Sequence, residues 1–499
     1  MVKSRRFIKF TGVFFVFVTI MVISSACLSQ NTADSLKGNV LGPFNSAADA
    51  IRAFKGAAPG DHIVITDGVY KDFDGNFGSR NGTRSRNIFI RAETPGGVTL
   101  TGKSRIHISN SSCITIRDFI FKDGFYAAGT SGAAILVSGD SSSYVRITNI
   151  LMDGYHSPVP EDDCRWVRVY GKYNEVDNST FINKRSRGVT VEICRSNTEP
   201  NFAKVHHNYF GFTKPVLDSD GREMNGLETV RIGTSERSQD DASSVVEYNY
   251  FEECDGEIEI ISNKSCKNIY RGNVFLNNNG TLTLRHGNFC IVEDNIFINT
   301  NKNGMGGVRV MDKGHVIRNN YFENLGQNRR SAISLEYAVP NSPLNRYWPV
   351  TGTLIEKNSF INSRMAISTG PTGGISSDQS IPPSGTRAAG NLIVTNSDTL
   401  QITYRANSDP AIAFSNNLAY GSNLQLSGYG VTPALRSGDI NGIRIANPQM
   451  NRNEDNLLMP GAGFTEYGMQ PPKGRHMLKR GETGASFAKE GAAPGGVQR

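Results

Sequence analysis

Residues 249–297 read NYFEECDGEIEIISNKSCKNIYRGNVFLNNNGTLTLRHGNFCIVEDNIF, and the tripeptide Asn-x-Phe begins there three times, at Asn249, Asn273 and Asn295. The phenylalanines of these tripeptides are 24 and 22 residues apart. Between them lie short runs of Val, Ile, Leu and Thr, which include the residue types that favour β-strands. A period of this length built from β-forming segments predicts a chain that winds into successive coils.

The same tripeptide recurs on both sides of this stretch. Further copies begin at Asn208, Asn320 and Asn358, with variants at Asp118 and Asn178. Leucine-rich repeats share the period, but their LxxLxL pattern is missing here. A parallel β-helix fits, because each coil then contributes about three strands and lies about 4.8 Å from the next. We expect the phenylalanines to stack inside it and the asparagines to hydrogen-bond from coil to coil.

Composition supports an all-β chain of 499 residues, since 52 of them are glycines and helical patterns are few. Residues 46–54 are the exception, and their apolar spacing predicts a short amphipathic helix that caps the first coil. Strand-like runs continue to about Ala419. We therefore expect a single-stranded parallel β-helix over residues 28–450, followed by a C-terminal extension, residues 451–499, that is partly disordered.

Residues 1–27 have the pattern of an export signal, with basic residues, an apolar run and small residues before Cys27. Ser24-Ser25-Ala26-Cys27 resembles a bacterial lipobox, which predicts lipidation of Cys27. Ordinary cleavage and an uncleaved anchor are the alternatives. We expect an exported protein, in the periplasm, at the outer membrane or secreted, whose contact with a membrane is limited to a lipid anchor.

Charge and cysteine content exclude several classes of protein. The net charge is +7 and is dispersed along the chain, so nucleic acid is not an expected partner. No CxxC pair or His/Cys spacing indicates zinc. We expect buried thiols with at most a single disulfide among the six cysteines after the signal, which are Cys113, Cys164, Cys194, Cys254, Cys266 and Cys290.

Two carboxylates in the opening stretch indicate a cation site. Glu257 and Glu259 alternate along a strand, so they point the same way about 7 Å apart. Two neighbouring acids repel each other unless something positive lies between them, and a hard cation such as calcium fits. Asn225 precedes Glu257 by one coil plus an insert, so we expect it beside the pair. The predicted metal ligands are Asn225, Glu257 and Glu259.

A basic row is expected next to this cluster. Lys264, Arg285 and Arg309 follow one another at roughly one coil per step, which predicts that they stack on one lateral face with His286 beside them. A cation that neutralises a uronate carboxylate would acidify the hydrogen on C5. Lys264 could remove this hydrogen once desolvation and crowding by Arg285 favour its neutral form. Arg285 or His286 could then assist the leaving oxygen, which completes a β-elimination.

Three motifs resemble polysaccharide lyase family 6, which contains alginate lyases and chondroitinase B. They are Asn225-Gly-Leu-Glu-Thr-Val-Arg-Ile-Gly233, the segment from Asn249 to Ser265, and Leu282-Thr-Leu-Arg-His-Gly-Asn288. The resemblance extends from roughly Asn39 to Ala419. It implies a right-handed β-helix, calcium dependence and cleavage by β-elimination.

The resemblance also implies a role for each matching residue. Asn225, Glu257 and Glu259 match calcium ligands, Lys264 matches the Brønsted base and Arg285 matches the Brønsted acid. Substrate-binding residues are matched by His286, by Arg309 and, more weakly, by Glu336.

Alternatives remain for substrate and activity. No second β-helix domain and no arginine cluster in the C-terminal coils are evident, which favours alginate over dermatan sulfate as the anionic polysaccharide. A glycoside hydrolase on this architecture would need two carboxylates that flank the bond. A non-catalytic β-helix that binds glycan is the remaining alternative, because the fold alone does not decide function.

Overall fold

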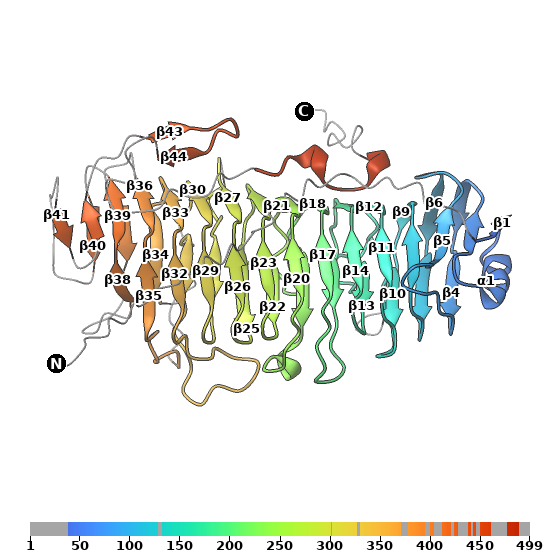
Figure 1. The fold of residues 1–499 in the computed structure, drawn as a ribbon, viewed down its shortest axis with the longest axis horizontal. Helices are drawn as coiled ribbons and strands as arrows, with labels where there is room; N and C mark the ends of the chain where they lie inside the picture. Colours follow the sequence, from blue (N-terminus) through green and yellow to red (C-terminus); the bar gives the residue numbers. More distant parts are fainter. Residues whose placement is uncertain are drawn as a thin grey trace, which may run out of the picture. The chain divides into compact units, whose positions relative to one another are not determined.

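A stack of parallel coils forms the body of the protein (Figure 1). The computed structural model describes residues 38–127, 132–300, 302–326, 330–370, 378–394, 400–403, 412–420, 424–427, 438–440, 443–445, 450–460 and 477–488. Each coil adds one strand to each of three long sheets, A, B and C, and within each sheet every strand pairs in parallel with the strand of the next coil. The predicted all-β, right-handed parallel β-helix is therefore confirmed.

The strands of the three sheets alternate along the chain. Sheet A contains β1 (Val40–Phe44), β2 (His62–Ile65), β5 (Ile88–Ala92), β8 (Ile114–Arg117), β11 (Arg146–Thr148), β14 (Glu175–Asp177), β17 (Lys204–His206), β20 (Val245–Glu247), β23 (Ile269–Arg271), β26 (Ile291–Glu293), β29 (Val316–Arg318), β32 (Leu354–Glu356), β35 (Thr386–Ala389) and β38 (Ile412–Ser415). Sheet B contains β3 (Gly68–Lys71), β6 (Val98–Gly102), β9 (Phe119–Gly124), β12 (Leu151–Asp153), β15 (Thr180–Ile182), β18 (Tyr209–Thr213), β21 (Tyr250–Cys254), β24 (Val274–Leu276), β27 (Ile296–Ile298), β30 (Tyr321–Glu323), β33 (Ser359–Ile361), β36 (Leu392–Val394), β39 (Asn417–Tyr420) and β42 (Ile443–Ile445), with β41 (Gly438–Ile440) antiparallel at its end.

Sheet C carries most of the residues of the predicted site. It contains β4 (Asp74–Gly78), β7 (Arg105–Ser109), β10 (Ile135–Ser138), β13 (Val167–Val169), β16 (Val191–Ile193), β19 (Val230–Gly233), β22 (Glu259–Lys264), β25 (Thr281–His286), β28 (Val308–Val310), β31 (Ile333–Leu335), β34 (Met365–Thr369), β37 (Leu400–Thr403) and β40 (Leu424–Ser427).

The asparagines of the repeat form the predicted ladder at the corner between sheets A and B. Asn273 shows the pattern, because its side chain donates to Val246 O and to Asn295 Oδ1 and accepts from the backbone and side-chain nitrogens of Asn249. The residue before each ladder asparagine has a positive φ, as in Tyr248 at 53° and Gly272 at 62°. This left-handed residue turns the chain, and the asparagine satisfies the backbone groups that the turn exposes.

The phenylalanines form the predicted internal ladder. Seven rings stack along the coils at centroid distances of 4.4 to 5.2 Å, and they belong to Phe181, Phe210, Phe251, Phe275, Phe297, Phe322 and Phe360. Together with the aliphatic residues of the strands they fill a single core. The six cysteines predicted as thiols are all buried and form no disulfide.

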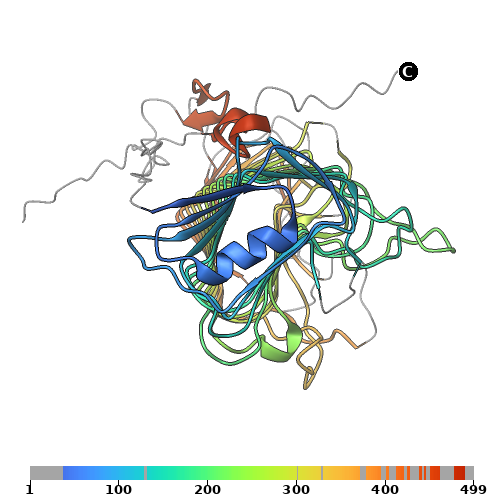
Figure 2. The ribbon, with the colours of Figure 1, turned by 90° about the vertical axis from the view of Figure 1, so that its right-hand side faces the viewer.

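Helix α1 (Ala47–Gly56) covers the open end of the first coil, as predicted (Figure 2). Ser46 caps its first turn by accepting from the backbone N–H of Asp49. Its buried face carries Ala50 and Phe54, and the Phe54 ring packs edge-on against Phe77 of β4. The helix thereby separates the core from solvent at this end.

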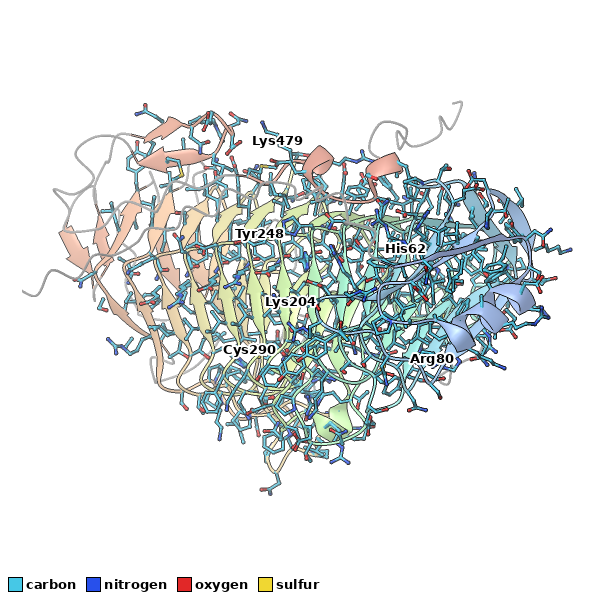
Figure 3. All side chains as sticks on the ribbon, turned by 45° about the vertical axis from the view of Figure 1, so that its right-hand side comes forward. His62, Arg80, Lys204, Tyr248, Cys290 and Lys479 are labelled. Carbon is cyan, nitrogen blue, oxygen red and sulfur yellow. The ribbon has the colours of Figure 1, made fainter. Side chains whose placement is uncertain are left out.

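Residues beyond the last coil return along sheet B. Strands β43 (Met450–Arg452) and β44 (Leu458–Pro460) form a hairpin, and Arg452 bonds to Glu323 of β30. Residues 477–488, which contain the short helices η4 (Arg480–Glu482) and η5 (Ser486–Ala488), continue along the same sheet, and Figure 3 labels Lys479 on this segment. The backbone N–H of Ala485, a fully buried residue, donates to the Thr180 hydroxyl of β15.

The predicted export signal, residues 1–27, lies outside the described residues. Among the described residues, no helix is long and apolar enough to cross a membrane.

Candidate active site

Three buried carboxylates meet at the edge of sheet C. Glu257 and Glu259 are 7% and 8% exposed, and Glu228, which precedes β19, is 2% exposed. One oxygen from each of the three lies within 4.8 Å of the others. Glu257 is held by the backbone, since its Oε2 accepts from Gly226 N at 2.6 Å and from Leu227 N at 3.0 Å. The cluster is thus built from two neighbouring coils.

The electrostatics of the cluster favour a bound cation. Burial raises the pKa of Glu257 well above its usual value, and the charges of Glu228 and Glu259 raise it further. Glu228 Oε2 is buried and accepts no hydrogen bond among the described residues. Converging carboxylate oxygens with an unused buried acceptor form the donor set of a hard divalent cation. The predicted metal site therefore fits the residues present, and the side chains able to hold the ion are those of Glu228, Glu257, Glu259 and the nearby Asn225.

Glu228 was not predicted from the sequence. The pairing of β19 with β22 aligns Val230 with Ile261, so the coils are 31 residues apart here. The same step places Glu228 directly under Glu259. The signal was present in the segment beginning at Asn225, but a step of 32 residues aimed at Asn225 passed over the second acid.

Lys264 lies beside the carboxylates. Its Nζ is 3.5 Å from Glu228 Oε1, and its side chain is 19% exposed. His286 is its partner in the next coil and is 1% exposed. Burial, together with the positive charges of Arg285 and Lys264, lowers the pKa of His286 to about 3. The imidazole is therefore neutral near pH 7, and its Nδ1 has no hydrogen-bond partner among the described residues.

Arg285 occupies a bulge in β25. The register between β22 and β25 shifts after Asn263, so that Lys264 pairs with His286 and Arg285 is the extra residue. A bulge re-aims a side chain, which is common beside active sites. Arg285 Nε lies 3.5 Å from Glu259 Oε1. The bulge thus directs the guanidinium toward the carboxylate cluster.

The predicted stack of three basic residues is wrong in its register. Arg309 of β28 pairs with Thr283, two positions before Arg285, because the bulge shifts the strand. Arg309 is 7% exposed, and its Nε donates to Glu336 Oε1 at 3.2 Å. Its Nη1 lies 3.8 Å from Glu259 Oε1. Arg309 and Glu336 therefore form a buried pair behind the carboxylate cluster.

Two adjoining clefts expose the site. The first has a volume of about 450 Å³, and its lining includes Asn225, Glu257, Glu259, Lys264, Arg285 and His286. The second, of about 290 Å³, shares Asn225 and Lys264 with the first and extends toward the N-terminal coils along Arg165, Arg187 and Arg231. Arg309 and Glu336 line neither cleft. Of the predicted residues, six are thus brought together at one surface, and two lie beneath it.

Comparisons with known proteins place the chain in a family. The sequence model described as chondroitinase B matches residues 44–438. The structure resembles AlyGC, a PL6 family alginate lyase, with 33% identity and a TM-score of 0.79, over 90% of this chain and 58% of that chain. This chain therefore spans just over half the length of AlyGC.

Two further solved structures are similar. A mannuronic acid specific polysaccharide family 6 lyase from human gut microbiota shares 28% identity, with a TM-score of 0.66, over 77% of this chain and 86% of that one. Pedsa3628, a PL6 family polysaccharide lyase from Pseudopedobacter saltans, shares the fold at 22% identity and a TM-score of 0.67, over 90% and 99%. No curated protein matches. The extent of the family match and the identity to AlyGC show that this chain belongs to polysaccharide lyase family 6, the family of chondroitinase B.

Proposed function

We propose that this protein is a calcium-dependent lyase that cleaves alginate, an uronate polysaccharide, by β-elimination and leaves 4,5-unsaturated uronate ends. The observation that carries the proposal is the position of Lys264, whose Nζ lies 3.5 Å from the carboxylate cluster inside an open cleft. A base next to a cation site is the arrangement that proton abstraction beside a carboxylate requires.

The residues of the chain divide the reaction between them. A divalent cation bound by Glu228, Glu257, Glu259 and Asn225 would neutralise the substrate carboxylate and so acidify the C5 hydrogen. Lys264 removes this hydrogen in its neutral form, the electron pair forms the C4–C5 double bond, and the C4–O bond breaks. The departing oxygen then takes up a proton.

Arg285 is the residue that best assists the departing oxygen. His286 is neutral because its pKa lies near 3, so it carries no positive charge to place on developing negative charge. The Arg285 guanidinium is charged and lines the same cleft. An arginine is a poor proton donor, so we assign it electrostatic stabilisation of the oxygen, with hydrogen bonds from its N–H groups.

A second candidate substrate is dermatan sulfate. The family model that matches the chain is that of chondroitinase B. In addition, Arg165, Arg187 and Arg231 line the second cleft, where an anionic group of the substrate could bind. Alginate is favoured because AlyGC, the relative with 33% identity, is an alginate lyase.

The expected site of action is outside the cytoplasm. Residues 1–27 have the pattern of an export signal, and Cys27 is the residue that a lipid would modify. We infer export to the periplasm, to the outer membrane or to the medium, where an anionic polysaccharide is accessible.

One assay tests the function. Purified protein is added to alginate, dermatan sulfate or pectate, with and without a chelator, and the ultraviolet absorbance of the unsaturated uronate is followed. We expect a rise on alginate that the chelator abolishes and added calcium restores. Absence of a rise on all three polymers would refute the lyase proposal.

A pair of lysine variants tests the proposed base. Lys264→Ala should lower kcat by about 10²- to 10⁴-fold, which is the usual contribution of a general base. Lys267→Ala is the matched control, because Lys267 is exposed and pairs with Asp241 at 2.7 Å. Circular dichroism should show an intact fold for both variants. Equal activity of the two variants would remove Lys264 from the role of base.

A further inference from the structure

The two ends of the catalytic groove differ. On the N-terminal side of Lys264, the second cleft continues the groove along three arginines. On the C-terminal side, the segment 338–348 leaves the coil of β31 and reaches back to Arg285 of β25, two coils away. Figure 2 shows this gold loop on the same side of the β-helix as the short green helix η2 (Ser235–Arg237).

The segment 338–348 contacts the catalytic residues directly. The carbonyl oxygens of Arg346 and Asn345 accept from the Arg285 guanidinium at 3.2 and 3.3 Å. The Tyr347 ring lies 4.6 Å from Arg285, and its hydroxyl accepts from Arg309 at 2.9 Å. The side chain of Arg309, which the next coil would present to the groove, is consequently buried under this segment.

The segment is itself anchored at several points. Ala338 and Ile381 exchange two backbone hydrogen bonds, at 2.8 and 3.0 Å, and the Gln379 side chain donates to Tyr337 O. Arg346 pairs with Asp378 at 2.6 Å. Within the segment, Val339 N donates to Tyr347 O at 3.0 Å. The wall over Arg285 is therefore a fixed part of the fold.

We propose that the segment 338–348 closes the groove beyond Arg285, so that the enzyme binds the end of a polysaccharide chain and releases short products from it. This inference rests on the proposed function. A sugar unit advances a chain by about as much as one coil, which is about 4.8 Å. Lys264 and the wall over Arg285 are roughly one to two coils apart, which leaves room for one or two sugar units.

The open side of the groove holds the rest of the polymer. Arg187 is partly exposed and lines the second cleft together with Arg165 and Arg231. These cations suit the regularly spaced carboxylates of an uronate chain. The polymer thus extends toward the N-terminal coils, while its end meets the side chain of Asn345, which lines the first cleft.

The degradation pattern of the whole protein on polymeric alginate tests this proposal. Removal of chain ends lowers the viscosity in proportion to the bonds cut, as counted by ultraviolet absorbance. We expect this proportion, with products of one or two units from the first minutes. An early collapse of viscosity with a ladder of long products would overturn the proposal while leaving the lyase function intact. Absence of ultraviolet absorbance would instead refute the proposed function and this inference with it.

Two variants of the same loop sharpen the test. Asn345→Ala shortens the side chain at the closed end but keeps the carbonyl that binds Arg285, so we expect the share of products longer than two units to rise severalfold. Leu344→Ala is the matched control, because Leu344 is 40% exposed and does not line either cleft. An identical product distribution for Asn345→Ala and for the unaltered protein would show that the loop does not limit product length.

Discussion

Tyr347 should control kcat although its ring lies outside the metal cluster. The ring centroid is 4.6 Å from the Arg285 guanidinium carbon and 5.6 Å from that of Arg309. The hydroxyl accepts from Arg309 at 2.9 Å. Tyr347→Leu removes the aromatic face and the hydroxyl, whereas Tyr347→Phe removes only the hydroxyl. The two variants therefore separate the contact with Arg285 from the contact with Arg309.

The expected size of the effect follows from these contacts. A cation–π contact contributes about 0.5–1 kcal/mol at an exposed site and about 2 kcal/mol when desolvated. The side chain of Arg285 is 16% exposed, so about 1–2 kcal/mol applies. Loss of this positioning energy in Tyr347→Leu should lower kcat by about 5- to 30-fold. Tyr347→Phe should lower kcat by less than about threefold, because Arg285 keeps its aromatic contact and Arg309 keeps its bond to Glu336.

Initial rates of ultraviolet absorbance give kcat and KM for each variant at saturating calcium. Because Tyr347 holds the catalytic arginine, the loss should appear in kcat with KM changed little. Calorimetric titration with calcium checks that the metal site is intact. If Tyr347→Leu keeps the kcat of the unaltered protein, or if Tyr347→Phe is equally impaired, the assigned role of the ring is wrong.

Three further predictions address the metal site, the fold and the pH dependence. Glu228→Gln removes one of three clustered carboxylates, so calcium binding measured by calorimetry should weaken at least tenfold, whereas Glu236→Gln, at an exposed acid, should leave it unchanged. Asn273→Ala removes four side-chain hydrogen bonds and should lower the free energy of unfolding in urea by about 2–6 kcal/mol, whereas the exposed Asn451→Ala should change it by less than about 0.5 kcal/mol; equal effects would contradict the ladder. Burial raises the pKa of Asp312 from 3.8 to about 6, so its contribution to stability is present below about pH 4 and is lost as the pH rises through 6; Asp312→Asn should therefore lose less stability than the unaltered protein between about pH 4 and pH 7, and parallel pH profiles would refute this.

Much of the candidate site could be predicted because the repeat converts sequence distance into spatial position. Glu257, Glu259 and Lys264 lie within one strand and the turn before it, so their proximity needed only the strand period. His286 follows by one coil. Glu228 was missed because the length of the insert between two coils was estimated rather than known, and an error of one residue moves a side chain to the other face.

The register beyond Arg285 could not be predicted for a different reason. A bulge in β25 adds one residue to the strand without a marked change in composition, and it separates Arg285 from the position of Arg309. The wall over Arg285 comes from residues about 60 positions later in the chain, and polar loop residues carry no periodic signal that would place them.

The sequence by itself determined the coiled fold, the internal phenylalanine and asparagine ladders and the residue types of the chemistry. It could do so because each coil repeats the same local pattern, and stacking such coils is the arrangement that buries the repeated apolar face. The tertiary structure alone decided that a third buried glutamate completes the carboxylate cluster, that Arg309 and Glu336 lie beneath the cleft, and that a returning loop closes the groove. These features depend on exact register and on long-range loop packing, which small insertions change without altering the repeat.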